Sequence, residues 1–236
     1  MFAYYYFHRI LIIAAVVPAI FLLVKVYKAD RLEKESYGII ATLLIGGIIS
    51  TVIAAFLERI GHGILSSLFY EDSLLYRLFM YVIVVAFAEE GSKYLLLKRR
   101  TWRSPEFNCQ FDGVVYAVSL SLGFALWENI SYVLSYGFAT AVARALTAIP
   151  GHASFGVFMG CFYGLAKKYD NRQDTAKSSH YRRLALLVPA LLHGTYDFIA
   201  ASQGDSLTIL FIVFIIAMFA YANKLVKSMS EHDQYI

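Results

Sequence analysis

Long apolar runs recur along the chain and are separated by short polar stretches. An apolar run of about 20 residues is long enough to cross a bilayer as a helix. Lipid offers the backbone no hydrogen-bond partners, so a spanning segment must be a helix or part of a closed barrel. Helices are predicted because the aromatic residues do not alternate with period 2, as they would in barrel strands. The predicted spans are residues 3–24, 37–57, 75–97, 112–136, 140–166, 184–201 and 206–226.

Composition supports an all-α, polytopic membrane bundle of about seven transmembrane helices. The chain has 236 residues, of which 59% are hydrophobic and 16% are charged, whereas soluble domains carry about 25% charged residues. The mean hydropathy is +0.58. No soluble domain, repeat or low-complexity linker interrupts the pattern, so residues 1–236 are predicted to form a single membrane-embedded domain.

The basic residues predict how the bundle is oriented. Sixteen of the 21 Lys and Arg residues lie in the loops 24–36, 98–110 and 167–183 and in the C-terminal tail, all on one side of the predicted arrangement. Because basic loops stay on the cytoplasmic side, the N-terminus is predicted to be outside and the C-terminus inside. This placement also accounts for the pI near 8.9 without a nucleic-acid partner.

A few ionisable residues fall inside the predicted spans, where charges are costly and usually functional. At a rise of 1.5 Å per residue, four different helices deliver them into one layer on the order of 10 Å thick. One shared, hydrated site in the middle and outer half of the bilayer is therefore predicted. Its residues are Glu89, Glu90, Lys93, Glu128, His152, His193 and Asp197.

Local spacing is consistent with such a site. Glu89 and Lys93 are four residues apart, as are His193 and Asp197, so each pair shares a helix face. Asp112 follows an inner loop and is expected at the membrane interface.

Prolines and glycines mark the two helices that carry the histidines. Pro150 comes just before His152 and Pro189 one turn before His193, so each is predicted to kink its helix and free a carbonyl. The pattern GxxxGxxxG predicts a face for close packing against a neighbouring helix; its glycines are Gly156, Gly160 and Gly164.

These motifs together resemble one protein family. The chain contains EEGSK (89–93), FALWE (124–128) and HGTYD (193–197), with GHASFGVFMG (151–160) between the last two. In order, spacing and membrane placement, the set resembles the PrsW family of bacterial intramembrane proteases. The wider group of CAAX prenyl endopeptidases has the similar motifs E-E-x-x-x-R and F-x-x-x-H. This chain departs from them, because its Lys93 comes four residues after Glu89 and because Glu128 stands where those relatives carry histidine.

The resemblance implies an intramembrane endopeptidase in a bacterial cell membrane. Its substrate would be a single-span, membrane-anchored anti-sigma factor, and its site-1 cut would lead, after a second protease acts, to release of a stress-response sigma factor. No organic cofactor is implied.

Peptide hydrolysis needs an activated water, stabilisation of the oxyanion and a proton for the leaving amine. Lys93 can stabilise one of two adjacent carboxylates as an anion, which leaves the other to act as base or acid. The catalytic candidates are Glu89, Glu90, Lys93, Glu128 and His193. The candidate ligands for Zn²⁺ are His152, His193, Asp197 and Glu128, which are the residue types that zinc accepts. A metal-free glutamate mechanism stays open, because no HExxH motif is present.

Two other functions, ion-coupled transport and a scaffolding role, are compatible with this set of residues. A proton- or ion-coupled transporter also needs buried carboxylates and histidines, although the two halves of the chain show no repeat of the kind found in many transporters. A membrane scaffold would need only structural ion pairs. Arg144, near the outer boundary, is expected to extend toward the interface, and a role in holding substrate is a secondary hypothesis.

Overall fold

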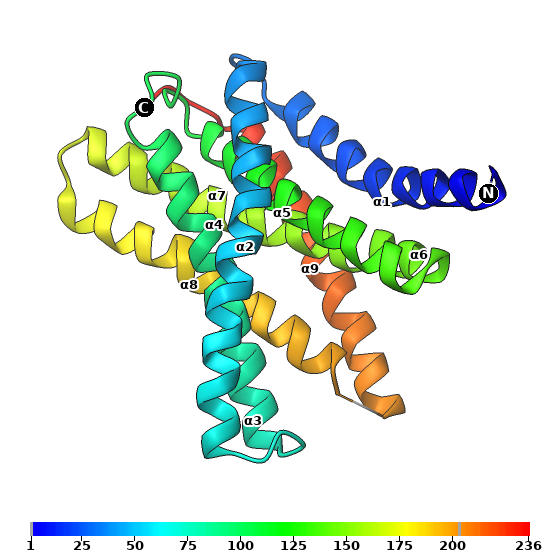
Figure 1. Ribbon diagram of the computed structural model, residues 1–236. Coiled ribbons are helices and arrows are strands. Elements are labelled where there is room, and N and C mark those ends of the chain that lie inside the picture. Colours follow the sequence, from blue (N-terminus) through cyan, green and yellow to red (C-terminus); the bar gives the residue numbers. More distant parts are fainter. Residues whose placement is uncertain (1, 203) are drawn as a thin grey trace.

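The computed structural model describes residues 2–202 and 204–236, and the described chain is helical with no strand. The predicted all-α fold is therefore confirmed (Figure 1). The helices are α1 (Phe2–Ala29), α2 (Tyr37–Leu68), α3 (Leu74–Leu78), the π-helix η1 (Phe79–Val85), α4 (Ala86–Thr101), α5 (Asp112–Tyr136), α6 (Phe138–Leu146), α7 (Ala148–Asn171), α8 (Thr175–Ala200) and α9 (Asp205–Glu231).

Five helical stretches in the described part of the chain are long and apolar enough to cross a membrane, which indicates a multi-pass membrane protein. The predicted spans 75–97 and 184–201 are not among them. The first is divided among α3, η1 and α4, and the second lies in α8, which begins with basic residues and carries polar groups further along. The five stretches are Arg9–Ala29, Tyr37–Leu68, Asp112–Tyr136, Phe138–Asn171 and Asp205–Glu231.

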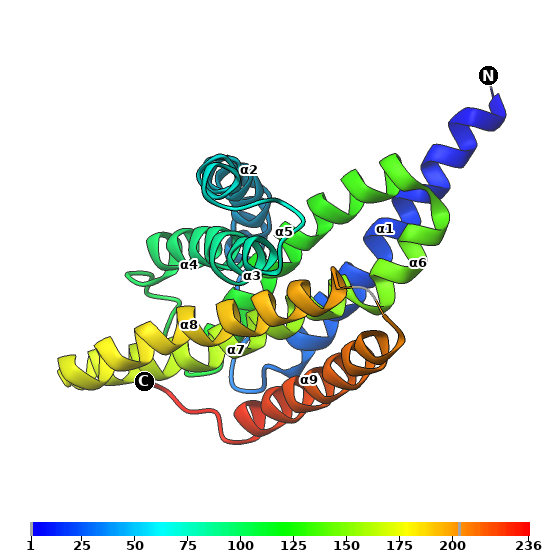
Figure 2. The same ribbon diagram turned by 90° about the horizontal axis from the view of Figure 1, so that it is seen from below.

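The centre of the bundle is the pair α5 and α7, against which the other long helices pack. Helix α2 crosses α5, α8 packs along α7, and α1 and α9 lie on the outside of this pair (Figures 1 and 2). Most of α5 and α7 is buried, whereas α1, α2 and α9 expose many apolar side chains. Exposed apolar faces are expected where lipid, not water, surrounds a helix.

Glycines allow the central helices to touch backbone to backbone. A Cβ atom added to Gly156 would lie 2.9 Å from the Cα of Val118, and one added to Gly160 would lie 2.8 Å from the nitrogen of Val114. One turn later, Gly164 lies against Gly113 at the start of α5 and against the backbone of Gln110 just before it. The predicted packing face of the GxxxGxxxG run is confirmed, and its partner is α5.

A second close approach joins α2 to α5. A Cβ atom on Gly123 would lie 2.8 Å from the Cα of Leu44, and one on Gly47 would lie 2.8 Å from the carbonyl carbon of Gly123. Beyond this crossing α2 continues to Leu68, well past its predicted end at residue 57. The extension carries the acidic residue Glu58 alongside the centre of the bundle.

The prolines behave differently from each other. The predicted span 140–166 is not one kinked helix, because α6 ends at Leu146 and α7 begins at Ala148. Pro150 is the third residue of α7, in the first turn, where a proline removes no hydrogen bond from the helix. Pro189 lies inside α8, as predicted.

The α1–α2 link, the α4–α5 loop and the C-terminal segment meet at one end of the bundle, near the top of Figure 1. The amide of Ile236 donates to the carbonyl of Asn108 over 2.8 Å, and the amide of Gln110 donates to the carbonyl of Gln234 over 3.0 Å. The hydroxyl of Ser230 donates to the carbonyl of Ala29. Three separate segments are thus joined there.

Candidate functional site

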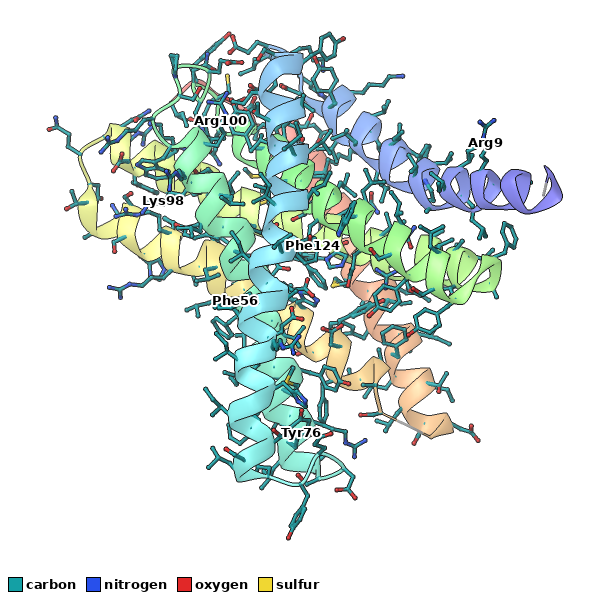
Figure 3. All side chains as sticks on the ribbon, in the orientation of Figure 1. Arg9, Phe56, Tyr76, Lys98, Arg100 and Phe124 are labelled. Atoms are coloured by element: carbon teal, nitrogen blue, oxygen red, sulfur yellow. The ribbon has the colours of Figure 1, made fainter. Side chains whose placement is uncertain are left out.

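The two adjacent glutamates of α4 share one buried lysine. The Nζ atom of Lys93 lies 3.1 Å from Oε2 of Glu89 and 2.8 Å from Oε1 of Glu90. Both Lys93 and Glu90 are fully buried. The ammonium also sits 3.7 Å from the ring centroid of Phe124, which Figure 3 shows in the middle of the bundle. The predicted i,i+4 pairing of Glu89 with Lys93 is confirmed as a direct contact.

Helix α8 brings His193 to the same carboxylates. Its Nδ1 lies 2.9 Å from Oε1 of Glu90, and its Nε2 lies 3.3 Å from Oδ2 of Asp197 and 3.8 Å from Oε2 of Glu89. The ring stacks on Phe155 at a centroid distance of 4.7 Å. Acidic groups therefore face both ring nitrogens of His193, and an aromatic face fixes the plane of its ring.

The approach of α8 depends on a glycine beside the histidine. A Cβ atom on Gly194 would lie only 2.6 Å from the Cα of Val82 in η1. A larger residue would push α8 away from the π-helix that precedes α4. The π-helical turns thus lie where the helices that carry His193 and the two glutamates are held together, and π-bulges are frequent at functional sites.

Helices α5, α6 and α7 supply a second set of contacts. The Nε2 atom of His152 lies 3.0 Å from Oε2 of Glu128, and its Nδ1 lies 3.3 Å from the Nζ of Lys93. Arg144 donates through Nη2 to Glu128 over 2.8 Å and through Nε to Oδ1 of Asn129 over 3.0 Å. His152 therefore links the Glu128–Arg144 pair to the α4 cluster.

These groups border a cavity of about 370 Å³. Of the two α4 glutamates only Glu89 lines it, while Glu90 and Lys93 lie behind its wall. Adjacent residues of a helix point about 100° apart, so this division follows from their positions in α4. The acidic, basic and histidine residues of the lining are Glu58, Glu89, Glu128, Arg144, His152, His193 and Asp197.

Two of these acidic, basic and histidine residues, Glu58 and Arg144, were not among the predicted catalytic and metal-binding residues. Glu58 lies just beyond the predicted span 37–57, and the apolar residues that recur after it, such as Ile60 and Ile64, were the available signal that the helix continues. Arg144 was expected to extend toward the interface, but it pairs with Glu128. Pairing between different helices has no signature in local spacing.

Four of the side chains could hold a metal ion. One nitrogen or oxygen atom from each of Glu89, Glu90, His152 and His193 lies within 4.8 Å of the other three. The Oε2 atom of Glu90 is buried without a hydrogen-bond donor, which leaves it available as a ligand. Carboxylates and imidazoles are ligand types that Zn²⁺ accepts, so the donor set fits such an ion.

Glu128 and Asp197, which were predicted as ligands, lie outside this four-residue group. Each instead contacts an imidazole: Glu128 contacts His152 and Asp197 contacts His193. Carboxylates in such positions fix the tautomer and orientation of a ligating histidine. The structure therefore brings all seven predicted residues together, with these two beside the histidines of the group.

Comparison with known proteins gives one family. The sequence model of the "PrsW family intramembrane metalloprotease" matches residues 36–222, which include every residue of the site.

Curated relatives match over nearly the whole chain. The "Protease PrsW" of Oceanobacillus iheyensis is 32% identical over 93% of this chain and 95% of its own length. Those of Halalkalibacterium halodurans and Bacillus subtilis are each 31% identical, over 95% and 83% of this chain and over 99% and 84% of their own lengths. No solved structure matches the chain.

Proposed function

The chain belongs to the PrsW family of intramembrane metalloproteases, and we propose that it makes the site-1 cut in a single-span anti-sigma factor. The family membership makes it a peptidase, an intramembrane endopeptidase carried by a multi-pass membrane protein. The proposal adds the substrate, the bacterial cell membrane as the location, and an arrangement of seven spans with the N-terminus outside and the C-terminus inside. The cut would release a stress-response sigma factor after a second protease acts.

The observation that carries the chemical proposal is the position of Glu89 at the wall of the cavity. Its side chain is nearly buried, yet it borders a space large enough to hold water beside a peptide bond. A carboxylate in that position takes a proton from water as the water attacks the peptide carbonyl, and returns it to the leaving amine. Glu89 is assigned as this general base and acid.

Glu90 and Lys93 hold Glu89 and the histidine in place. Lys93 donates to both glutamates, and Glu90 reaches His193 from behind the cavity wall. The burial of Lys93 means that its charge is little screened by water. This arrangement keeps the α4 carboxylates and the α8 imidazole in fixed relative positions.

A metal ion is part of the proposal. His152, His193 and the free oxygen of Glu90 would hold it, and Zn²⁺ is the ion that best fits these donors. A bound ion of this kind polarises the peptide carbonyl as a Lewis acid and stabilises negative charge on its oxygen. Asp197 and Glu128 orient the two imidazoles, and Arg144 fixes Glu128.

An apolar groove supplies a path for the substrate. A second cavity, of about 360 Å³, lies between α2 and α5 and shares Glu58, Glu89 and Glu128 with the first. Its remaining walls are mainly apolar, and Phe124 and Trp127 contribute the aromatic part. A single apolar span could enter from the lipid along this groove and present a peptide bond to Glu89. With the proposed orientation, the cut lies toward the outer leaflet.

Cleavage by the purified, full-length protein in liposomes tests the assignment. The substrate is a single-span anti-sigma factor, and the products are mapped by mass spectrometry. Glu89→Gln is expected to lower kcat by about 10²-fold or more, since a general base contributes 10²- to 10⁴-fold. Glu71→Gln, at an exposed glutamate of the α2–α3 link, is the matched control. Wild-type rates for both Glu89→Gln and Glu90→Gln would refute the catalytic assignment.

Other outcomes separate the parts of the proposal. Fragments that end on the cytoplasmic side would refute the predicted depth of the cut. Cleavage of unrelated single-span proteins but not of anti-sigma factors would refute the substrate alone. Transport driven by a pH gradient, without proteolysis, would favour an ion-coupled transporter.

The metal is tested on the same preparation. Protein purified without a chelator is expected to contain one Zn²⁺ per chain by elemental analysis, and a zinc chelator is expected to abolish cleavage until Zn²⁺ is restored. His152→Ala should lose the ion, whereas His180→Ala, at a histidine of α8 outside the group, should retain it. Metal-free protein with full activity would refute the metal.

A further inference from the structure

A second group of acidic side chains lies buried at the end of the bundle where three segments meet. Asp30 and Glu35 belong to the α1–α2 link, and Asp112 is the first residue of α5. Their exposed fractions are 2%, 4% and 0%. One carboxylate oxygen from each lies within 4.8 Å of the other two. Asp112 was expected at the membrane interface, and the structure instead shows its side chain enclosed by protein.

The outer oxygens of this group have partners, whereas the inner ones have none. The hydroxyl of Tyr116 donates to Oε2 of Glu35 over 2.6 Å, and the amides of Asn108 and Cys109 donate to Oδ2 of Asp112 over 3.0 and 2.6 Å. Oε1 of Glu35 and Oδ1 of Asp112 are buried without a donor. Each of these two carboxylates is therefore held by one oxygen and leaves the other free.

Asp30 is an independent sign of a missing partner. It directly follows the end of α1, and neither of its carboxylate oxygens has a hydrogen-bond donor. Within the described residues, no basic side chain forms an ion pair with Asp30, Glu35 or Asp112. The charge of Lys34 acts on Asp30, but its ammonium donates to backbone carbonyls, including that of Asp30, and forms no ion pair with the Asp30 carboxylate. A buried carboxylate without a partner is strongly destabilising, so a positively charged ligand is the expected occupant.

We propose that Asp30, Glu35 and Asp112 bind a hard divalent cation at a site separate from the catalytic group. Asp112 and Glu128 are sixteen residues apart on α5, which is about 24 Å along the helix. A set of oxygen donors without histidine or thiolate selects Ca²⁺ or Mg²⁺ over Zn²⁺.

The number of protein oxygens favours the larger ion. Mg²⁺ requires near-ideal octahedral geometry, loses its waters reluctantly and is usually bound through only one or two carboxylates, whereas Ca²⁺ accepts six to eight oxygens in flexible geometry. Three buried carboxylates are available here, with one oxygen of each within 4.8 Å of the other two. Ca²⁺ is therefore expected to bind more tightly than Mg²⁺.

The bound cation would join two parts of the chain beside a third. The group unites the α1–α2 link with the start of α5, and the C-terminal segment touches the same region through Asp233, whose Oδ1 accepts from the amide of Phe111 over 2.8 Å. Oδ2 of Asp233 also lacks a donor. Binding there stabilises the packing of α1 and the C-terminal segment on α5 and takes no part in hydrolysis.

Binding of Ca²⁺ to the full-length protein in detergent micelles tests the site. The protein is stripped with EDTA, and binding is measured by equilibrium dialysis with radioactive Ca²⁺ and by the shift in Tm. One Ca²⁺ per chain and a raised Tm are expected for the wild type. His152→Ala, which alters only the catalytic group and leaves the Lys93 ion pairs in place, is expected to bind Ca²⁺ in the same way.

Variants of the acidic group supply the decisive comparison. Asp30→Asn is expected to weaken Ca²⁺ binding by about tenfold or more, since even partners outside the ligand set change metal affinity by 10- to 100-fold. It removes an unpaired buried charge, so the ion-free variant is expected to fold; Glu35→Gln is the second variant. Asp72→Asn, at an exposed aspartate of the α2–α3 link, is the control and should bind as the wild type does.

Three results would overturn the proposal. The first is no saturable binding of either Ca²⁺ or Mg²⁺ to the wild type, and the second is undiminished binding to Asp30→Asn. The third is a Tm that responds to pH but to neither ion, which would mean that shared protons, and not a cation, neutralise the group.

Discussion

Replacement of Lys93 by Met would test whether the α4 cluster acts as one charged unit. The side chain of Lys93 is fully buried, with its Nζ 3.1 Å from Glu89 and 2.8 Å from Glu90. Removal of one partner from a buried ion pair costs about 3–5 kcal/mol, because the charge that remains has no compensation. Lys93→Met is therefore expected to lower the free energy of unfolding by about 3–5 kcal/mol, which is roughly 150- to 4,000-fold in the folding equilibrium.

The same reasoning predicts a rescue. If Glu89 and Glu90 are changed to Gln in the Lys93→Met background, no uncompensated carboxylate remains, and most of the lost stability should return. Reversible unfolding in mixed micelles, as the fraction of sodium dodecyl sulfate is raised, measures all three proteins. Lys98→Met, at a partly exposed lysine in the last turn of α4, is the matched control and should change stability by no more than about 0.5 kcal/mol.

Two results would refute this account. A loss below about 1 kcal/mol for Lys93→Met would mean that the ammonium does not compensate two buried carboxylates. If the effects of the three substitutions on the free energy of unfolding simply add, with no rescue, the stability lost in Lys93→Met arises from packing against Phe124 and not from charge.

Three further predictions concern packing, positioning and pH. Gly160→Ala should cost about 1–3 kcal/mol of unfolding free energy, because its new methyl group meets the α5 backbone, whereas Gly63→Ala, in open space, should not destabilise the protein; thermal unfolding compares them. Arg144→Met should lower kcat about 10-fold or more with a smaller change in KM, and Arg144→Lys should restore only part of the activity, because lysine lacks the second nitrogen donor of the guanidinium. Steady-state cleavage assays measure kcat and KM. Equal activity of the wild type and both variants would contradict the positioning role. In buffer with EDTA, Tm should fall between about pH 4 and pH 7. Burial raises the pKa of Asp30 to about 6 and the pKa of Glu35 to about 7, so the folded protein binds more protons than the unfolded chain. The stability that this extra proton binding contributes is complete below about pH 4 and is lost as the pH rises through these two pKa values. Asp30→Asn should make the fall of Tm with pH less steep, as measured by fluorimetric melting.

Features that depend on neighbouring residues in one helix could be predicted from the sequence. Hydrophobic runs located the helical segments, and spacing of four residues identified the contacts of Glu89 with Lys93 and of His193 with Asp197. The glycine repeat of α7 indicated a packing face for the same reason. Each of these inferences needs only the periodicity of a helix.

Features that depend on how helices meet could not be predicted in this way. The contact of His152 with Glu128 joins α7 to α5, and no local pattern states that these two residues face each other. The pairing of Arg144 with Glu128 was missed for the same reason. The break at Thr147 was also missed, because apolar residues continue through it and only the backbone angles show the end of α6.

The repeated glycines of α7 have a consequence for how the active arrangement is selected. An interface whose small residues recur every fourth position can be assembled in more than one alignment, since a slip of four residues puts one glycine where another was. Such a slip slides α7 about 6 Å along α5 and carries His152 out of reach of Glu128. The steric fit alone therefore tolerates neighbouring alignments, and the polar contact between the two helices distinguishes the competent one from its well-packed but inert alternatives.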